Sequence, residues 1–235
     1  MTHASYYPLL AFLLTGMVLS IWHKKLTLPA ALTGGLCGLL VFAGAGFTGI
    51  AIMASFFIVG TLATGWQMTK KENINVSTKS DRQRKVSQVI ANAGIAAIAG
   101  GLTIVFPSYF NLWGLVIAAS FSSATADTLA SELGTIYGKR FYNILTWKPD
   151  QRGLDGVVSL EGTLIGVAGS ALIAAIYIIG YGFSNHFFVL ILAGTIGNLT
   201  DSILGAALER KGILKNDGVN FLNTLVAALV AACFM

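Results

Sequence analysis

Long apolar segments separated by short connections constrain the fold of this chain more than any other feature. A bilayer requires a helix of roughly 17–25 apolar residues. We predict eight membrane-spanning helices, over Tyr6–Trp22, Leu28–Phe42, Gly46–Trp66, Val86–Phe106, Tyr109–Thr125, Val158–Tyr181, Phe187–Leu208 and Val219–Phe234. Only 11% of the 235 residues are charged, against roughly 25% in a soluble domain. The sequence therefore predicts an all-α, multi-pass integral membrane protein, with residues 1–235 forming a single domain.

Local signals support these boundaries. Pro29 suits the first turn of a helix, where a backbone N–H has no partner within the helix. Pro107 is expected to divide the apolar stretch from Val86 to Thr125 into two spans. The first segment lacks a small-residue cleavage site followed by a polar region, so we expect a retained span rather than a signal peptide.

The positive charges predict the direction in which the chain crosses the membrane. All 15 lysines and arginines fall in the connections after the first, third, fifth and seventh segments: Lys24 and Lys25; Lys70, Lys71, Lys79, Arg82, Arg84 and Lys85; Lys139, Arg140, Lys148 and Arg152; Arg210, Lys211 and Lys215. Because cytoplasmic loops retain positive charge, we expect these connections in the cytoplasm and both termini outside, with the chain in the plasma membrane. This topology explains the net charge of +5 without a nucleic-acid partner.

The most basic connection is the polar loop over residues 67–85. Two interpretations stay open for it. It is either a solvated loop that contacts anionic lipid, or a segment that contacts the phosphate of a nucleotide or of a lipid.

Carboxylates within or at the ends of the apolar segments are the most informative polar residues. They are Asp127, Glu132, Glu161 and Asp201. A carboxylate in such a place is costly and is usually paired or functional. Under the predicted topology all four lie towards the cytoplasmic face, beside the basic loops. Asp127 and Asp201 each lie on a helical stripe of small residues, where another helix or a ligand can approach the backbone closely.

An internal repeat is also expected. Asp127-Thr128-Leu129 is similar to Asp201-Ser202-Ile203, and Asp155-Gly156-Val157 is similar to Asp217-Gly218-Val219. Each pair consists of a span, a polar loop and a second span in the same order. The pattern predicts a parallel duplication, in which residues 122–163 and 194–223 build one site from two halves. Chance similarity in a biased composition is the alternative.

Oxygen-bearing side chains dominate this polar cluster, whereas the cysteines and histidines match no metal-ligand spacing. Carboxylate and amide oxygens favour a hard cation, Mg²⁺ rather than Zn²⁺, and Mg²⁺ typically binds one or two carboxylates together with substrate phosphates. The neighbouring basic residues and the glycine-rich segment 153–162 are suited to bind such phosphates. The pattern favours phosphoryl transfer, and the absence of a Gly-x4-Gly-Lys-Ser/Thr sequence excludes a P-loop.

Two motif regions carry a resemblance to a known family. The first consists of residues 122–134 (SSATADTLASELG), Lys148-Pro149 and residues 153–163 (GLDGVVSLEGT), and the second of residues 197–206 (GNLTDSILGA) and 216–221 (NDGVNF). Together they resemble the integral membrane family called domain of unknown function 92, which includes transmembrane protein 19 and phytyl-phosphate kinases. Asp127-x2-Ala130-x3-Gly134-x3-Gly138 is also similar to the signature of CTP-dependent polyprenol kinases.

This resemblance implies a membrane kinase that uses CTP with Mg²⁺ to convert a prenyl monophosphate, such as phytyl phosphate, into its diphosphate at the cytoplasmic face. Asp127 and Asp201 would hold Mg²⁺, with Glu132 and Glu161 as further ligands or a base. The residues expected to bind the nucleotide and the phosphates are Ser123, Thr128, Gly134, Lys139, Lys148, Arg152, Asn198, Asn216, Asp217 and Asn220. The prenyl tail would enter between helices beside Gly162, Gly166 and Ser170.

Two other functions stay open. A CTP-dependent cytidylyltransferase acting on a lipid phosphate would release pyrophosphate instead of CDP. A transporter of small molecules or lipids would use the parallel repeat to form a path, although acids clustered towards one face argue against a site at the bilayer midplane. The sequence leaves the lipid chain length, the nucleotide and the oligomeric state open, a homo-oligomer included.

Overall fold

The computed structural model describes residues 6–72 and 83–235 of the chain. Its α-helices are α1 (Tyr6–Trp22), α2 (Leu28–Gly65), α3 (Met68–Glu72), α4 (Val86–Val105), α5 (Phe110–Tyr137), α6 (Leu160–Tyr181), α7 (His186–Leu204) and α8 (Asn216–Ala232). Between them lie a 3-10 turn η2 (Pro107–Tyr109), a π-helical turn η3 (Gly205–Glu209), and the short antiparallel strands β1 (Tyr142–Asn143) and β2 (Val157–Val158). The prediction of an all-α fold is confirmed for the described residues, with this short β-pair as an addition.

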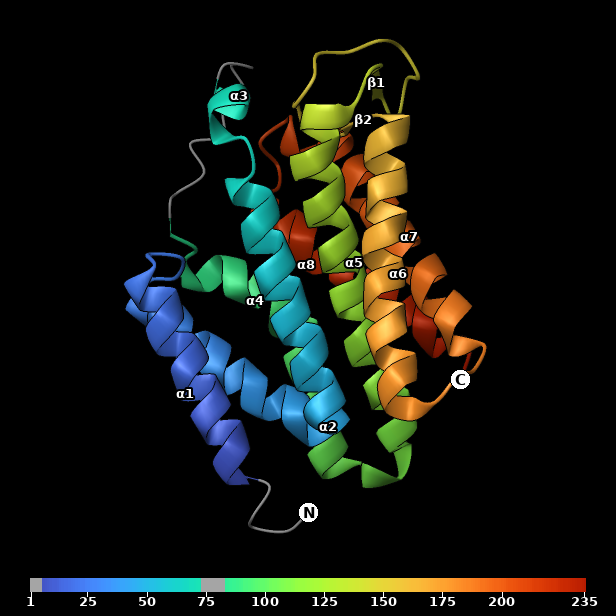
Figure 1. The fold of residues 1–235 in the computed structure, drawn as a ribbon. Coiled ribbons are helices and arrows are strands. Elements are labelled where there is room, and N and C mark those ends of the chain that lie inside the picture. The colour runs from blue at the N-terminus through green and yellow to red at the C-terminus, as the bar shows by residue number, and fades with distance from the viewer. Residues whose placement is uncertain (1–5, 73–82) are drawn as a thin grey trace.

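Helix α5 lies at the centre of the bundle (Figure 1) and contacts α2, α4, α6, α7 and α8. Every residue from Gly114 to Ala126 is buried. A helix that is buried on all sides has to be covered by other helices, whatever their order in the chain. This position gives the polar end of α5, which follows Ala126, neighbours from both halves of the sequence.

Small residues let the helices around α5 approach one another closely. A Cβ added at Gly134 of α5 would lie 2.6 Å from the Cα of Gly162 in α6. A Cβ at Gly166 would lie 3.1 Å from the carbonyl oxygen of Ala126. Gly162, Gly166 and Ser170 are all buried. Packing against α5 and α7 accounts for these small residues, and the entry of a prenyl tail beside them stays a prediction.

Helix α2 combines two of the predicted spans in one 38-residue element with a sharp kink at Gly46. Gly46 has φ 59° and ψ −150°, a conformation that strains any residue with a Cβ. In Figure 1 the two halves of α2 run in clearly different directions from this point. The sequence predicted two spans, the first ending at Phe42 and the second beginning at Gly46, and the structure has a kink at Gly46 in place of a connecting loop.

Two further local predictions are confirmed at the helix boundaries. Pro29 lies in the first turn of α2, after Thr27, whose Oγ1 accepts a hydrogen bond from the backbone N–H of Ala30 at 3.3 Å. Such a cap satisfies one of the N–H groups that have no partner at a helix start. Pro107 separates α4 from α5, as the first residue of η2.

Four of the described helices are long and apolar enough to cross a membrane: α2, α4, α6, and α7 together with η3, over His186–Glu209. Helix α1 is apolar but shorter. The eight crossings, the outward termini and the internal repeat stay predictions. The predicted basic loop begins with α3, and its residues 73–82 lie outside the described part of the chain.

Candidate functional site

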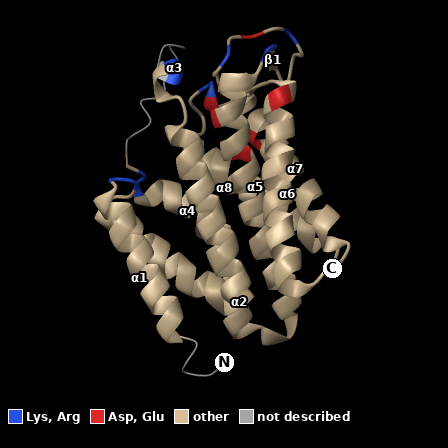
Figure 2. Cartoon of the chain, in the orientation of Figure 1, with Lys and Arg blue, Asp and Glu red and all other residues tan. Residues whose placement is uncertain are grey.

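A cleft of about 950 Å³ lies among the ends of the helices that carry the charged residues. Figure 2 shows that Lys, Arg, Asp and Glu gather at one end of the bundle and at the turn after α1, and that the opposite end has none among the described residues. The cleft is lined by the turn after α1, the second half of α2, α3, the start of α4, the last turns of α5, the starts of α6 and α8, and the end of α7 with η3. Both halves of the described chain therefore contribute to it, and residues 153–159 of the α5–α6 connection also line it.

Asp127 of α5 and Asp201 of α7 line this cleft, and their carboxyl groups lie within hydrogen-bonding distance of each other. Both side chains are half-buried. Two negative charges this close and largely out of water repel each other strongly unless a proton or a cation lies between them. The predicted pairing of these two aspartates in space is therefore present, although 74 positions of sequence separate them.

A buried hydrogen-bond chain fixes Asp201. The Nδ2 of Asn223 donates to the Oδ2 of Asp201 at 2.7 Å, and the Oγ of Ser123 donates to the Oδ1 of Asn223 at 3.0 Å. Asn223 and Ser123 are both fully buried. Ser123, predicted to bind a phosphate, thus lies behind the cleft and contacts Asp201 through Asn223.

Glu132 forms an ion pair with Lys71 of α3. The Lys71 Nζ lies 2.5 Å from the Glu132 Oε2, and it also donates to the carbonyl oxygens of Ala63 at 2.8 Å and Thr64 at 3.2 Å, in the last turn of α2. The ammonium group has three N–H donors, so all three are used. Glu132 lines the cleft as predicted, but its charge is compensated by a lysine that sequence analysis did not connect with it. The 61 positions between the two residues leave no local signal of this pair.

Arg84 is a second cleft residue that sequence analysis did not single out, although contact with a phosphate was one of the two interpretations of its loop, residues 67–85. Its backbone N–H donates to the carbonyl oxygen of Lys25 at 2.9 Å, and its own carbonyl accepts from the N–H of Thr27 at 3.2 Å. Its guanidinium carbon lies 5.9 Å from the ring centre of Phe56 and 5.8 Å from that of Phe57. Burial lowers the pKa of Arg84, and the charge of Glu132 opposes this effect. Since an arginine starts far above neutral pH, the group stays a cation.

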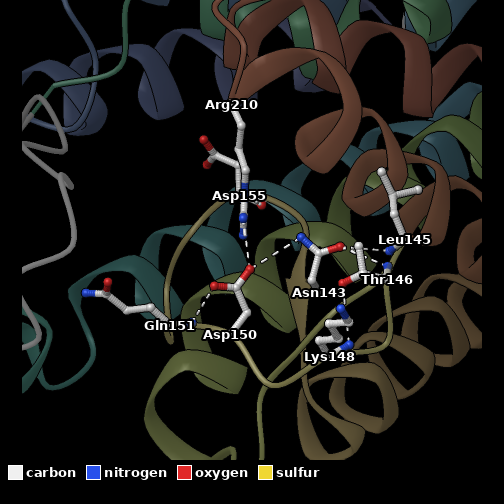
Figure 3. Close-up of polar contacts among 8 residues, drawn as sticks. All are labelled: Asn143, Leu145, Thr146, Lys148, Asp150, Gln151, Asp155 and Arg210. Atoms are coloured by element: carbon white, nitrogen blue, oxygen red, sulfur yellow. Dashed lines mark hydrogen bonds and ion pairs between the residues drawn. The ribbon is translucent and has the colours of Figure 1, made fainter.

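The connection between α5 and α6 is a structured loop that closes one side of the cleft. Figure 3 shows Arg210, which follows η3, reaching across to Asp150 and to the backbone of Asp155. The Arg210 Nη1 lies 2.8 Å from the Asp150 Oδ2, and its Nε donates to the Asp155 carbonyl oxygen at 2.5 Å. Gly156, with φ 70°, then packs against Ala206 of η3. Only a glycine fits there without strain, and the loop is thereby held against the end of α7.

The predicted site residues fall into two groups. Those that line the cleft are Asp127, Thr128, Glu132, Gly134, Asn198, Asp201, Asn216 and Asn220. Those that do not line it are Ser123, Lys139, Lys148, Arg152, Glu161 and Asp217. The structure therefore brings together the acids and amides of α5, α7 and α8, whereas the predicted cations of the α5–α6 loop point elsewhere.

The contacts of the second group explain their positions. The Glu161 carboxylate accepts from the backbone N–H of Lys139 at 3.3 Å, and Lys148 is exposed. The Arg152 guanidinium lies 5.6 Å from the ring centre of Phe141. Asp217 lies in the first turn of α8, where a negative charge is favourable to the helix dipole.

Every cleft residue outside the predicted motif regions 122–163 and 194–223 comes from the first half of the chain. The polar ones are His23, Lys24, Lys25, Thr61, Thr64, Lys71, Arg84, Gln88 and Asn92. The basic residues among them were recognised as charges of the cytoplasmic loops, and only the folded chain brings them to the acids. No group of three or more His, Cys, Asp or Glu residues suited to a metal occurs within the described ranges.

Comparisons with known proteins identify the family of this chain. The family model described as integral membrane protein DUF92 matches residues 11–228. The chloroplastic protein VTE6 of Arabidopsis thaliana is 34% identical over 203 residues, which are 83% of this chain and 61% of that relative. An uncharacterised membrane protein of Synechocystis sp. is 36% identical over 202 residues, 83% of this chain and 76% of the relative. An uncharacterised membrane protein of Methanocaldococcus jannaschii is 32% identical over 217 residues, 91% of this chain and 88% of the relative.

This chain thus spans less than two thirds of the length of VTE6. No solved structure matches it. The family match covers both motif regions and every residue of the cleft, and the chain belongs to the DUF92 family of integral membrane proteins.

Proposed function

We propose that this protein is a membrane kinase that transfers the γ-phosphoryl group of a nucleoside triphosphate, CTP, to a prenyl monophosphate such as phytyl phosphate. The observation that carries the proposal is the contact between the carboxyl groups of Asp127 and Asp201 inside the cleft. The resemblance of the motif regions to phytyl-phosphate kinases and to CTP-dependent polyprenol kinases supports the choice of reaction.

The side chains around this pair fit a hard cation. Asp127 and Asp201 offer carboxylate oxygens. The Oδ1 of Asn220, which lines the cleft, is buried and has no hydrogen-bond partner among the described residues. Mg²⁺ prefers such oxygen ligands and usually completes its coordination with water and substrate phosphates. When bound, it would neutralise charge on the transferred phosphoryl group. The two aspartates are the residues that would hold it.

The proposed reaction needs positioning more than acid–base chemistry. A phosphate oxygen of the prenyl monophosphate attacks the γ-phosphorus of CTP and forms a new P–O bond. The bond between the γ-phosphorus and the β–γ bridging oxygen breaks, and CDP leaves with that electron pair. Because the acceptor phosphate is already ionised near neutral pH, no strong general base is required. Glu132, whose charge is compensated by Lys71, is better suited to hold α3 in place than to accept a proton.

The proposed site faces the cytoplasm, where the positive-inside rule puts the basic connections. Purified protein in detergent is incubated with Mg²⁺, each of the four nucleoside triphosphates and prenyl monophosphates of different chain lengths. We expect prenyl diphosphate and a nucleoside diphosphate, formed preferentially with CTP. Release of pyrophosphate instead would identify a cytidylyltransferase, and uptake into liposomes without turnover would identify a transporter.

The variant Asp127→Asn is expected to abolish turnover while the protein still unfolds near the wild-type temperature. Glu161→Gln is the matched control, because it removes a carboxylate that lies outside the cleft, and it should retain most of the activity. Full activity of Asp127→Asn would remove Asp127 from the site.

A further inference from the structure

The part of the cleft formed by the first half of the chain carries cations to which the proposed reaction gives no role so far. Lys24 and Lys25 come from the turn after α1, and Arg84 comes from the residues before α4. Arg84 lies close to the acidic part of the cleft: a Cβ added at Gly60 would lie 3.3 Å from the Arg84 Nη2 and 3.4 Å from the Thr128 Cγ2. Thr128 directly follows Asp127. Arg84 and Thr128 thus both pack against Gly60, and Arg84 lines the same cleft as the aspartate pair.

Arg84 is held in place without the use of its side-chain donors. Its backbone is hydrogen-bonded on both sides to the turn after α1, and Phe56 and Phe57 contact the guanidinium through cation–π interactions. These contacts leave the N–H groups of the guanidinium available, because the face of a ring attracts the cation and accepts no strong hydrogen bond. The backbone hydrogen bonds and the ring contacts thus hold the cation in the lining of the cleft without using its N–H donors.

The carboxylate whose charge acts on Arg84 already has another partner. Glu132 raises the stability of the charged guanidinium by Coulomb attraction, but its Oε2 is paired with Lys71. Within residues 6–72 and 83–235, the Arg84 side chain makes no hydrogen bond or ion pair. A planar guanidinium offers five N–H donors in a geometry that matches two oxygens of one phosphate. An anion with at least two oxygens is the ligand that such a group recognises best.

We propose that Arg84, assisted by Lys25, binds a phosphate group of the substrate and holds it next to the Asp127–Asp201 pair. The carbonyl oxygen of Lys25 accepts a hydrogen bond from the backbone N–H of Arg84, and Lys25 lines the same cleft. This inference rests on the proposed kinase function for the identity of the substrate, but the anion site itself does not. The phosphate belongs either to the lipid monophosphate or to the nucleotide. The role that sequence analysis gave to Lys139, Lys148 and Arg152 thereby passes to residues of the first half of the chain.

Steady-state kinetics of Arg84→Gln distinguish the two sources of the phosphate. Loss of a bidentate, charge-assisted contact is expected to raise KM on the order of 10- to 100-fold. An increase confined to the KM of the prenyl phosphate identifies the lipid phosphate, and one confined to the KM of the nucleotide identifies the nucleotide. Arg84→Lys keeps the charge but loses the bidentate geometry, and it should give an intermediate KM. Lys211→Gln, which removes an exposed cation outside the cleft, should leave both KM values unchanged.

Binding of inorganic pyrophosphate, measured by calorimetry on the full chain in detergent, tests the site independently of turnover. Wild-type binding that is lost in Arg84→Gln and weakened in Lys25→Gln supports the anion site, even if no nucleotide and lipid pair is turned over and the kinase proposal fails. Thermal unfolding of each variant shows whether it is folded, and Arg84→Lys and Lys25→Gln carry the test if Arg84→Gln is not. Equal pyrophosphate affinity and equal KM values in folded wild type and variants would overturn the inference.

Discussion

The buried side chain of Asn223 contacts two polar groups at once, one 22 and the other 100 positions away in the sequence. It donates to Asp201 of α7 and accepts from Ser123 of α5. An unpaired carboxylate oxygen or amide at this depth would lose the hydrogen bonds that it makes with water in the unfolded chain. The chain of contacts therefore fixes one of the two carboxylates on which the proposed chemistry depends.

Replacement of Asn223 by Ala is expected to lower stability by about 1–3 kcal/mol, because the partners on both sides lose a buried hydrogen bond. Turnover should fall as well, since Asp201 loses the group that orients it. Ser123→Ala should give a smaller loss of turnover in the same direction. The measurements are thermal or denaturant unfolding in detergent and the rate of prenyl diphosphate formation.

Ser120→Ala is the matched control for this chain. Ser120 lies on the same helix and is equally buried, but its hydroxyl donates to the carbonyl oxygen of Val116 in its own helix at 3.0 Å. Its loss should leave turnover unchanged. If Ser123→Ala and Ser120→Ala had the same activity, the hydrogen-bond chain would not orient Asp201.

At the scale of elements, α3 is a five-residue helix, and a helix of that length is not stable by itself. The Lys71 ammonium attaches it to the last turn of α2 and to Glu132 of α5. Lysine near a helix C-terminus also interacts favourably with the helix dipole. The cleft wall at this point thus depends on one cation and its three acceptors.

A double-mutant cycle with Lys71→Met and Glu132→Gln is expected to give a coupling free energy of about 1–3 kcal/mol, the range for a hydrogen-bonded, largely buried charge pair. Each single variant should also raise hydrogen exchange in α3 and in the last turn of α2. Lys70→Met, at the neighbouring exposed position, is the control. Additive effects of the two substitutions on the free energy of unfolding would show that the pair contributes no net stability.

The loop between α5 and α6 should loosen in acid. The backbone N–H of Gln151 and the Arg210 guanidinium lower the pKa of Asp150. Because the folded-state pKa lies below the unfolded one, the contribution of Asp150 is fully present above about pH 4, the ordinary range of an aspartate. It is lost as the pH falls through the lowered value.

Hydrogen exchange of the loop, corrected for the intrinsic rate, is the measurement for this pH dependence. Protection in the wild type should decrease below about pH 4, and Asp150→Asn should show reduced protection at neutral pH with a flatter profile. Burial raises the pKa of Asp155, which changes the pH dependence in the opposite direction. This effect is the same in the wild type and in Asp150→Asn. The difference between the wild-type and Asp150→Asn profiles therefore reports on Asp150 alone. Identical profiles would show that the Asp150–Arg210 ion pair does not hold the loop.

The elements that the sequence predicted correctly are those set by local chemistry. Apolar runs, Pro107 and Gly46 mark boundaries that the structure has at the same places. Helix α5 continues to Tyr137, past the predicted apolar span that ends at Thr125, in agreement with the helical stripe predicted around Asp127. The aspartates of the cleft could be predicted because a carboxylate in an apolar segment is conspicuous. Lys71 and Arg84 could not, because their partners come from tertiary packing.

At the scale of the whole molecule, the charged end of the bundle predicts how the protein sits in a membrane. The loop after α5 and the turn after η3 both lie at that end, whereas the turn between α6 and α7 lies at the other (Figure 2). If the positive-inside rule holds for this chain, single cysteines at Lys148 and Lys211 face the cytoplasm and one at Ser184 faces outward.

Labelling with a membrane-impermeant thiol reagent on intact cells and on inverted vesicles tests this topology. The exposed native Cys233 is first replaced by Ser, while Cys37 is buried and stays. We expect Ser184→Cys to react in cells and the other two positions only in inverted vesicles. Reaction of all three positions from the same side would refute the predicted crossing pattern.

The cleft takes one part from residues 23–92 and the other from residues 127–220, and the turn that joins these two stretches, η2, lies at the opposite end of the bundle. A chain divided at η2 would consist of two pieces, and each would hold only half of the binding groups. Neither fragment could work by itself, yet the two could reassemble through the helix contacts that surround α5. The architecture thus makes this protein a candidate for a split reporter, in which enzymatic activity would report the association of the two fragments inside a membrane.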